Sequence, residues 1–343
     1  MGNKNNYKKI QDEISKNPLT YNGKPFKKKV TEKWLGDKFS EDGLSASITE
    51  TITSRKGRVT AASFEVKALL EDLRMMRLGG IMGALQIWEM AIIPMLMNNS
   101  ETWTDIKSDH IEALENMQTL FLSMILCVPN SCPRVALCWD TGTNKMSTRI
   151  IKKKLTFSNH LKNLSDDSLA KQIFREQKEN KWPGLISEAK LLCNELFIPD
   201  ITEPHNRFST NMWKNEVTKA ADERDERYMK EEMVNLSKVE VMKEERFGTK
   251  QYLKEMTMQQ ARMQFRIRTC MTKCKMNFSN DMRNKATLWR CESCETCIDT
   301  QQHVLFCPAY KSLREGKSLE NDKDIVDYFI QVMRLRSKLD LTR

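Results

Sequence analysis

The sequence predicts a mainly α-helical protein. Its 343 residues include only 12 Gly and 9 Pro, too few for the many tight turns of a β-sandwich or barrel. Apolar residues make up 40% of the chain, which is enough to build a core, and 21 Met stand beside an aromatic content of only 8%. Apolar positions also recur at helical spacing over much of the chain.

Turn signals and apolar spacing divide the chain into six parts. In order, these are a polar N-terminal tail (1–19), a β-hairpin (20–45), a helical bundle (46–130), a helical connector (131–255), a basic region rich in Cys and His (256–317) and a closing helix (318–343). Asn22-Gly23 between apolar flanks predicts the hairpin turn. Ser47 to Glu50 fits a capping box at the start of the bundle.

Three helices are predicted in the bundle, over 48–73, 81–97 and 105–127, and three such helices with apolar faces form a small antiparallel bundle. The second is the most apolar stretch of the chain. Because Glu89 and Pro94 interrupt it, we expect a buried core helix and no membrane span.

The C-terminal half contains two segments whose patterns leave more than one structure open. Residues 209–247 are rich in charge and predict one long exposed helix or two, ending at Gly248. Residues 256–268 alternate like a strand in helical surroundings, so their structure is left open. Asn321 is expected to cap the closing helix.

Positive charge is concentrated in two places. The net charge of the chain is +10, from 56 Lys+Arg and 46 Asp+Glu. Residues 1–60 carry 13 basic and 7 acidic side chains, and residues 261–317 carry 11 and 5, so each segment has a net charge of +6. Basic patches of this kind are typical of nucleic-acid-binding proteins and also occur as ordinary solvated surfaces.

Six of the ten Cys lie between residues 270 and 307, which indicates a metal site. Two ligand sets are open, because either Cys291 or Cys297 can join Cys294, His303 and Cys307. We favour the set with Cys291. Three thiolates and one imidazole suit zinc, and four protein ligands leave no open position, so the expected role is structural.

No catalytic pattern is found. The sequence has no Gly-rich phosphate loop, no Gly-x-Ser-x-Gly and no His-Glu-x-x-His, so we predict no catalytic residues and no small-molecule substrate. The N-terminus has no apolar signal segment, and we expect an intracellular protein, nuclear or cytoplasmic, that is not secreted.

Several motifs resemble one family in their order. Lys33-Trp34-Leu35-Gly36 resembles the primer-grip hairpin of LINE-type (non-LTR) retrotransposon reverse transcriptases. The helices after it look like the thumb of those enzymes, and Leu137 to Gly142 looks like the connector that follows. The segment from Asp299 to Pro308 resembles their C-terminal Cys/His finger.

The resemblance implies a nucleic-acid-binding fragment with no polymerase activity. The family's palm carboxylates precede the primer-grip hairpin, and no aromatic-x-Asp-Asp motif occurs in this sequence. The expected partner is an RNA or DNA backbone, with other retroelement proteins as further candidates. The residues implied to contact it are Lys27, Lys28, Lys29, Trp34, Leu35, Gly36, Arg55, Lys56, Arg58, Arg266, Arg268, Lys273, Lys275 and Arg290. Two alternatives stay open, a zinc-stabilised helical protein-interaction scaffold and a truncated RNA-directed DNA polymerase.

Overall fold

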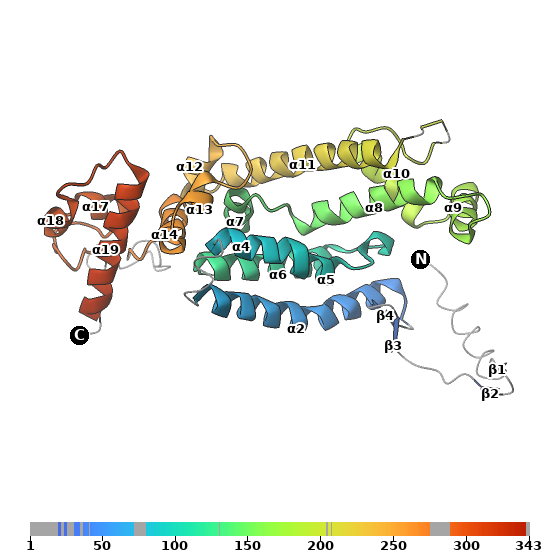
Figure 1. The fold of residues 1–343 in the computed structure, drawn as a ribbon, viewed down its shortest axis with the longest axis horizontal. Coiled ribbons are helices and arrows are strands. Elements are labelled where there is room, and N and C mark those ends of the chain that lie inside the picture. The colour runs from blue at the N-terminus through green and yellow to red at the C-terminus, as the bar shows by residue number, and fades with distance from the viewer. Residues whose placement is uncertain are drawn as a thin grey trace. The chain divides into compact units, whose positions relative to one another are not determined.

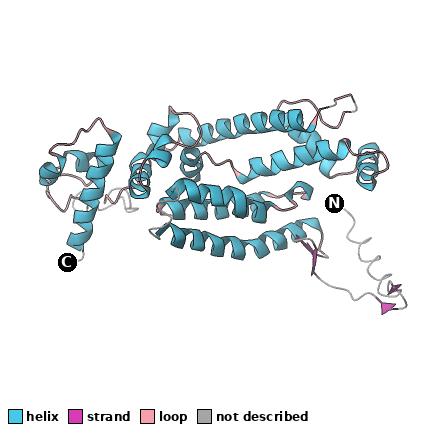
Figure 2. Ribbon diagram, viewed as in Figure 1, coloured by secondary structure: helices cyan, strands magenta, loops and turns pink. Residues whose placement is uncertain are grey.

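The computed structural model is mainly helical, as predicted (Figures 1 and 2). It describes residues 20–21, 24–25, 31–34, 37–40, 42–71, 80–129, 131–203, 205–206, 208–274 and 289–340. The chain divides into two compact units, Met1–Thr51 and Ile52–Arg343.

The first unit contains two short antiparallel strand pairs and the start of a helix. Its elements are β1 (Thr20–Tyr21), β2 (Lys24–Pro25), β3 (Thr31–Trp34), β4 (Asp37–Ser40) and the first two turns of α2 (Leu44–Glu71). β1 pairs with β2 and β3 pairs with β4. The predicted turn residues Asn22-Gly23 lie outside the described residues.

The start of α2 differs from the predicted capping box. The helix begins at Leu44, so Ser47 lies within its first turn. The Ser47 hydroxyl donates to the Gly43 carbonyl (2.9 Å) and accepts from the Ser40 amide (2.8 Å). The box prediction is wrong because Ser47 joins β4 to the helix and does not cap the helix itself.

The second unit contains all the remaining elements. These are α4 (Gly80–Ile87), η1 (Trp88–Ile92), α5 (Ile93–Met97), η2 (Ser100–Thr102), α6 (Ser108–Leu126), α7 (Arg134–Thr141), α8 (Met146–Lys162), α9 (Leu169–Glu179), α10 (Leu185–Glu195), α11 (Thr210–Val234), η3 (Ser237–Val239), α12 (Glu240–Lys243), α13 (Gln251–Glu255), α14 (Met258–Arg268), α17 (Gln301–Phe306), η4 (Pro308–Tyr310), α18 (Lys311–Arg314) and α19 (Asp322–Asp340). The charged segment 209–247, predicted as one long helix or two, thus contains two α-helices, α11, which ends at Val234, and the short α12. The ambiguous segment before Arg268 is helix α14, whose start is capped by the Thr257 hydroxyl.

By length and composition alone, the apolar stretch Gly80–Met97 could cross a membrane. The core helices of many soluble proteins meet the same two criteria. Trp88 is fully buried and stacks on Phe121 of α6 with ring centroids 4.6 Å apart. The exposed Glu89 forms an ion pair with Arg149 of α8. These contacts favour a core helix.

A wider helical turn in this stretch follows from Pro94. Proline has no amide hydrogen and clashes with the carbonyl four residues earlier. The turn Trp88–Ile92 is a π-helix, in which the Ile93 amide donates to the Trp88 carbonyl five residues back. The helix therefore continues past Pro94 to Met97 without a break.

Helices α8, α10 and α11 pack around one apolar core (upper part of Figure 1). Trp213 of α11 is fully buried there, and its indole nitrogen donates to the Leu155 carbonyl of α8 at 2.8 Å. The first turn of α8 is held by carboxylates from other helices. Glu115 of α6 accepts from the Met146 amide and Asp225 of α11 accepts from the Lys145 amide.

Helix α7 is tied to α14 by a buried ion pair. Asp140 is fully buried, and the Arg268 guanidinium contacts both of its carboxylate oxygens at 2.8 and 3.1 Å. Arg268 also forms two hydrogen bonds to Glu245, and the Tyr252 hydroxyl donates to Asp140 at 2.8 Å. A buried charge is tolerated only when it is paired and hydrogen-bonded, and here both conditions hold.

The end of α7 is closed by the segment that follows α12. Gly142 ends the helix with φ +69°, and the Thr249 hydroxyl and the Lys250 amide donate to the last carbonyls of the helix, those of Thr141 and Asp140. A Cβ at residue 142 would lie 2.5 Å from the Thr249 backbone nitrogen. Only glycine therefore fits this close approach.

Removal of the arginine should strongly destabilise the protein. We expect Arg268→Ala to lower the free energy of unfolding by about 3–5 kcal/mol, because it leaves Asp140 buried without a charge partner. Urea unfolding followed by circular dichroism measures the change. Arg290→Ala, at an exposed arginine, should change it by less than about 0.5 kcal/mol. Equal losses in the two variants would contradict the buried pair.

Acid should weaken the same network. Burial alone would raise the pKa of Glu245, but hydrogen bonds from Arg268 and Lys250 outweigh it and lower the pKa from 4.5 to about 2. Because the pKa is lower in the folded state, this contribution to stability is present above pH 4.5 and is lost as the pH falls towards 2. Glu245→Gln should therefore flatten the decline of the melting temperature between pH 5 and 2, measured against wild type. An unchanged decline would contradict this assignment.

Candidate metal centre

Three cysteines and one histidine converge in the C-terminal part of the chain. The ligand atoms of Cys291, Cys294, His303 and Cys307 all lie within 4.8 Å of one another. The Cys291 and Cys307 sulfurs are 3.8 Å apart, and Cys294 Sγ lies 3.3 Å from His303 Nε2. This cluster could hold a metal ion, and it is the favoured ligand set of the sequence analysis.

A tight loop presents the first two cysteines. Arg290 and Ile298 form an antiparallel bridge, and the Cys291 amide donates to the Cys297 carbonyl at 2.8 Å. The Cys291 carbonyl in turn accepts from the Glu295 amide at 2.8 Å. The chain therefore folds back on itself, which brings Cys294 next to Cys291.

One helical turn supplies the other two ligands. The Thr300 hydroxyl caps α17 by accepting from the His303 amide at 2.9 Å. His303 lies in the first turn of this helix and Cys307 directly follows it, so the spacing of four residues brings both side chains to the same side. Cys297 is exposed and does not belong to the cluster, which leaves the alternative ligand set without support.

The environment prepares Cys294 to act as a thiolate. Burial raises its pKa, but hydrogen bonds from the side chain and backbone of Thr296 and from the Cys297 backbone together outweigh this and lower the pKa from 9.0 to about 6. Burial raises the pKa of Cys307. Since the thiolate is the metal-binding form, Cys294 is the thiol that is ready for a metal at neutral pH.

Helix α19 holds the loop between Arg290 and Ile298, which carries Cys291 and Cys294, in place. Arg336 forms two hydrogen bonds to Asp299, at 2.7 and 3.0 Å, and its guanidinium also lies 3.9 Å from Cys291 Sγ. Tyr328 donates to the Val304 carbonyl of α17. Cys291 and Cys307 are buried in one core with Val326 and Phe329 of the same helix, which makes the cluster part of the folding core. The sequence analysis missed Arg336, because nothing in its local sequence points to a site 37 residues earlier.

The residues expected to contact nucleic acid fall into four groups. Lys27, Lys28, Lys29, Leu35, Gly36 and Lys275 lie outside the described residues, and of Trp34 only the backbone is described, at the end of β3. Lys56, Arg58, Lys273 and Arg290 are exposed. Arg55 and Arg268 are used inside the protein, and Arg266 is partly buried.

Arg55 and Arg268 correct the expectation that they face a phosphate backbone. Arg55 is only 1% exposed, donates to the carbonyls of Leu96 and Asn98, and lies over the Trp103 ring. Arg268 is bound to Asp140, as described above. A cluster of basic residues in the sequence does not show which of their side chains are buried in the folded protein. Arg266 donates to the Cys127 carbonyl and also lines an open groove.

Comparison of the chain with protein-family models, with curated proteins and with solved structures found no match.

Loss of a ligand should release the metal and unfold the C-terminal part. We expect His303→Ala protein to lose its bound metal, and residues 289–340 to become sensitive to protease, because metal binding contributes directly to folding in such small sites. Helices α4 to α11 should keep their circular dichroism signal. Cys297→Ser is the matched control, and it should retain one metal ion per chain by elemental analysis. Loss of metal from this control, or retention in the His303 variant, would contradict the ligand set.

Proposed function

We propose that this protein binds nucleic acid, RNA or DNA, without catalysing a reaction, and that a structural zinc ion stabilises its C-terminal part. The motif order in the sequence supports an origin from a LINE-type reverse transcriptase. The proposal assigns no catalytic residue. Among the residues that the structure describes, the Cys291 cluster is the one group of three or more His, Cys, Asp or Glu side chains close enough to hold a metal.

The geometry of the cluster supports zinc. Around a tetrahedral zinc with Zn–S bonds of about 2.3 Å, two sulfurs are about 3.8 Å apart, and a sulfur and an imidazole nitrogen are about 3.6 Å apart. The corresponding distances here are 3.8 and 3.3 Å. Three thiolates and one imidazole also form the soft, closed ligand set that structural zinc prefers. Such an ion would hold the loop and α17 together.

The observation that carries the nucleic-acid proposal is a set of exposed cations without partners. The side chains of Lys56, Arg58, Lys273 and Arg290 are exposed, and none makes a hydrogen bond or ion pair to another described residue. Some other basic residues, such as Lys152 and Arg224, are paired with acids of neighbouring helices, whereas Lys214 and Lys219 of α11 are exposed and unpaired among the described residues as well. The four cations named first differ from these in lying within the two segments of net charge +6, 1–60 and 261–317. Unpaired cations on a chain of net charge +10 attract a polyanion.

A charge reversal on α2 tests the proposal. We expect Lys56→Glu/Arg58→Glu to weaken binding of RNA and DNA oligonucleotides and to lower the slope of log affinity against log salt by about 1.4 to 1.8, because two phosphate contacts are lost. Fluorescence anisotropy between 50 and 200 mM salt measures both quantities. Arg55 is left unchanged because its substitution would disturb the core.

Lys214→Glu/Lys219→Glu on α11 is the matched control. Both lysines are exposed, and the change in net charge is the same. This control should keep most of the affinity and the salt slope. Binding that is absent at 50 mM salt, or that does not respond to salt, would contradict the proposal and favour a protein-interaction scaffold.

A further inference from the structure

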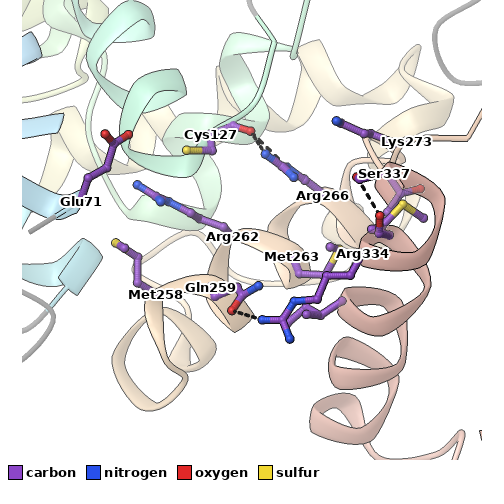
Figure 3. Close-up of a pocket in the computed structure, with 13 residues that line it drawn as sticks. Glu71, Cys127, Met258, Gln259, Arg262, Met263, Arg266, Lys273, Arg334 and Ser337 are labelled. Atoms are coloured by element: carbon purple, nitrogen blue, oxygen red, sulfur yellow. Dashed lines mark hydrogen bonds between the residues drawn. The ribbon is translucent and has the colours of Figure 1, made fainter. Parts of the chain in front are cut away.

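An open groove lies between α14 and α19, with a volume of about 660 Å³ (Figure 3). We call it the methionine groove. Its floor consists of Met258 and Met263 from α14 and Ile330 and Met333 from α19. Each of these four side chains is 7–9% exposed. The groove is open, so its apolar floor is shallow, and only a small area of each of these buried residues faces it.

Cations surround this floor. Arg262, Arg266, Lys273 and Arg334 line the groove, with Glu71 as the one acidic side chain of the lining (Figure 3). The local charge is thus +3, in a groove whose floor is apolar. An anionic ligand with a flat apolar part would match both features.

Two of these cations have unused hydrogen-bond donors. Arg262 donates from Nε to the Ile125 carbonyl at 2.8 Å, while its buried Nη2 has no partner among the described residues. The side chain of Lys273 likewise makes no bond to a described residue. Lys273 is exposed, so a phosphate oxygen can reach its ammonium group and form a charge-assisted hydrogen bond, whereas the Arg262 donor is closed off by the protein.

The floor fits a nucleobase. Methionine sulfur makes favourable contacts with aromatic rings, and its flexible side chain adapts to different ring shapes. A shallow floor suits a flat ring better than a bulky side chain of a partner protein, which needs a deep pocket to be desolvated. In a duplex the base faces are stacked inside the helix, so only an unpaired base can lie on this floor.

We infer that the methionine groove binds a single strand of nucleic acid, with a base against the methionines and the adjacent phosphates at the exposed Lys273 and Arg334. This inference rests on the proposed function and specifies its ligand at one site. Its volume is within the range of pockets that hold one small ligand, which allows one or two nucleotides. Binding there should have little base specificity, because the floor offers contacts to any ring.

The test uses the full chain and the double variant Lys273→Glu/Arg334→Glu. Lys311→Glu/Lys323→Glu is the matched control, since both lysines are exposed, lie outside the groove and give the same change in net charge. The probe is a fluorescent thymidine oligonucleotide of about 12 residues. We expect the groove variant to bind it about tenfold more weakly at 50 mM salt, and its salt slope to fall by about 1.4, while the control stays near wild type.

Two further probes separate base contact from charge alone. An abasic strand with the same number of phosphates, and a blunt duplex of the same length, should both bind wild type more weakly than the thymidine strand. Equal affinity for the abasic strand would overturn the base contact.

The two proposals can fail separately. Equal loss in the groove variant and the control would overturn the groove while leaving nucleic-acid binding intact. Failure of wild type to bind any nucleic acid, with capture of an acidic amphipathic peptide instead, would overturn both. Helicity by circular dichroism and metal content confirm that the variants are folded.

Discussion

The buried pair of Asp140 and Arg268 is the polar contact on which the packing of α14 against α7 depends. A carboxylate that is fully buried can remain charged only beside a fixed cation, so the position of α7 determines where α14 must lie. Glu245 and Tyr252 complete the hydrogen bonds, which draws α12 and α13 to the same place. Helix α7 is thereby joined to the segment from Glu245 to Arg268, more than 100 residues later in the chain.

The position of α14 then organises the C-terminal part. Met263 of this helix belongs to the same core as Cys291, Cys307 and Phe329. Phe329 lies on α19, and Arg336 of the same helix is hydrogen-bonded to Asp299 beside the cysteine loop. The helices that carry the groove are therefore the helices that hold the cluster. A disturbance of the cysteine cluster would therefore reach the groove through these helices, even though no residue of the cluster lines the groove.

The sequence alone predicted the helical class and the ligand set, because both depend on local patterns. Helical spacing needs only nearby residues, and Cys-x-x-Cys with a His and a Cys four apart needs only one loop and one turn. The Leu96 carbonyl that Arg55 contacts and the Asp140 carboxylate that Arg268 contacts could not be predicted, since they lie more than 40 and more than 120 residues away in the sequence. The groove was missed for the same reason, because its walls come from helices that neighbour each other only after folding.

Gly142 has a consequence for the history of the gene. Any side chain at this position would collide with the backbone at Thr249, so the glycine cannot be replaced without moving the segment that covers α7. A gene copy that no longer makes a working protein accumulates changes at this codon as fast as at any other. Genomic copies in which the glycine persists, while neighbouring silent positions have diverged, would therefore be copies whose folded product is still under purifying selection.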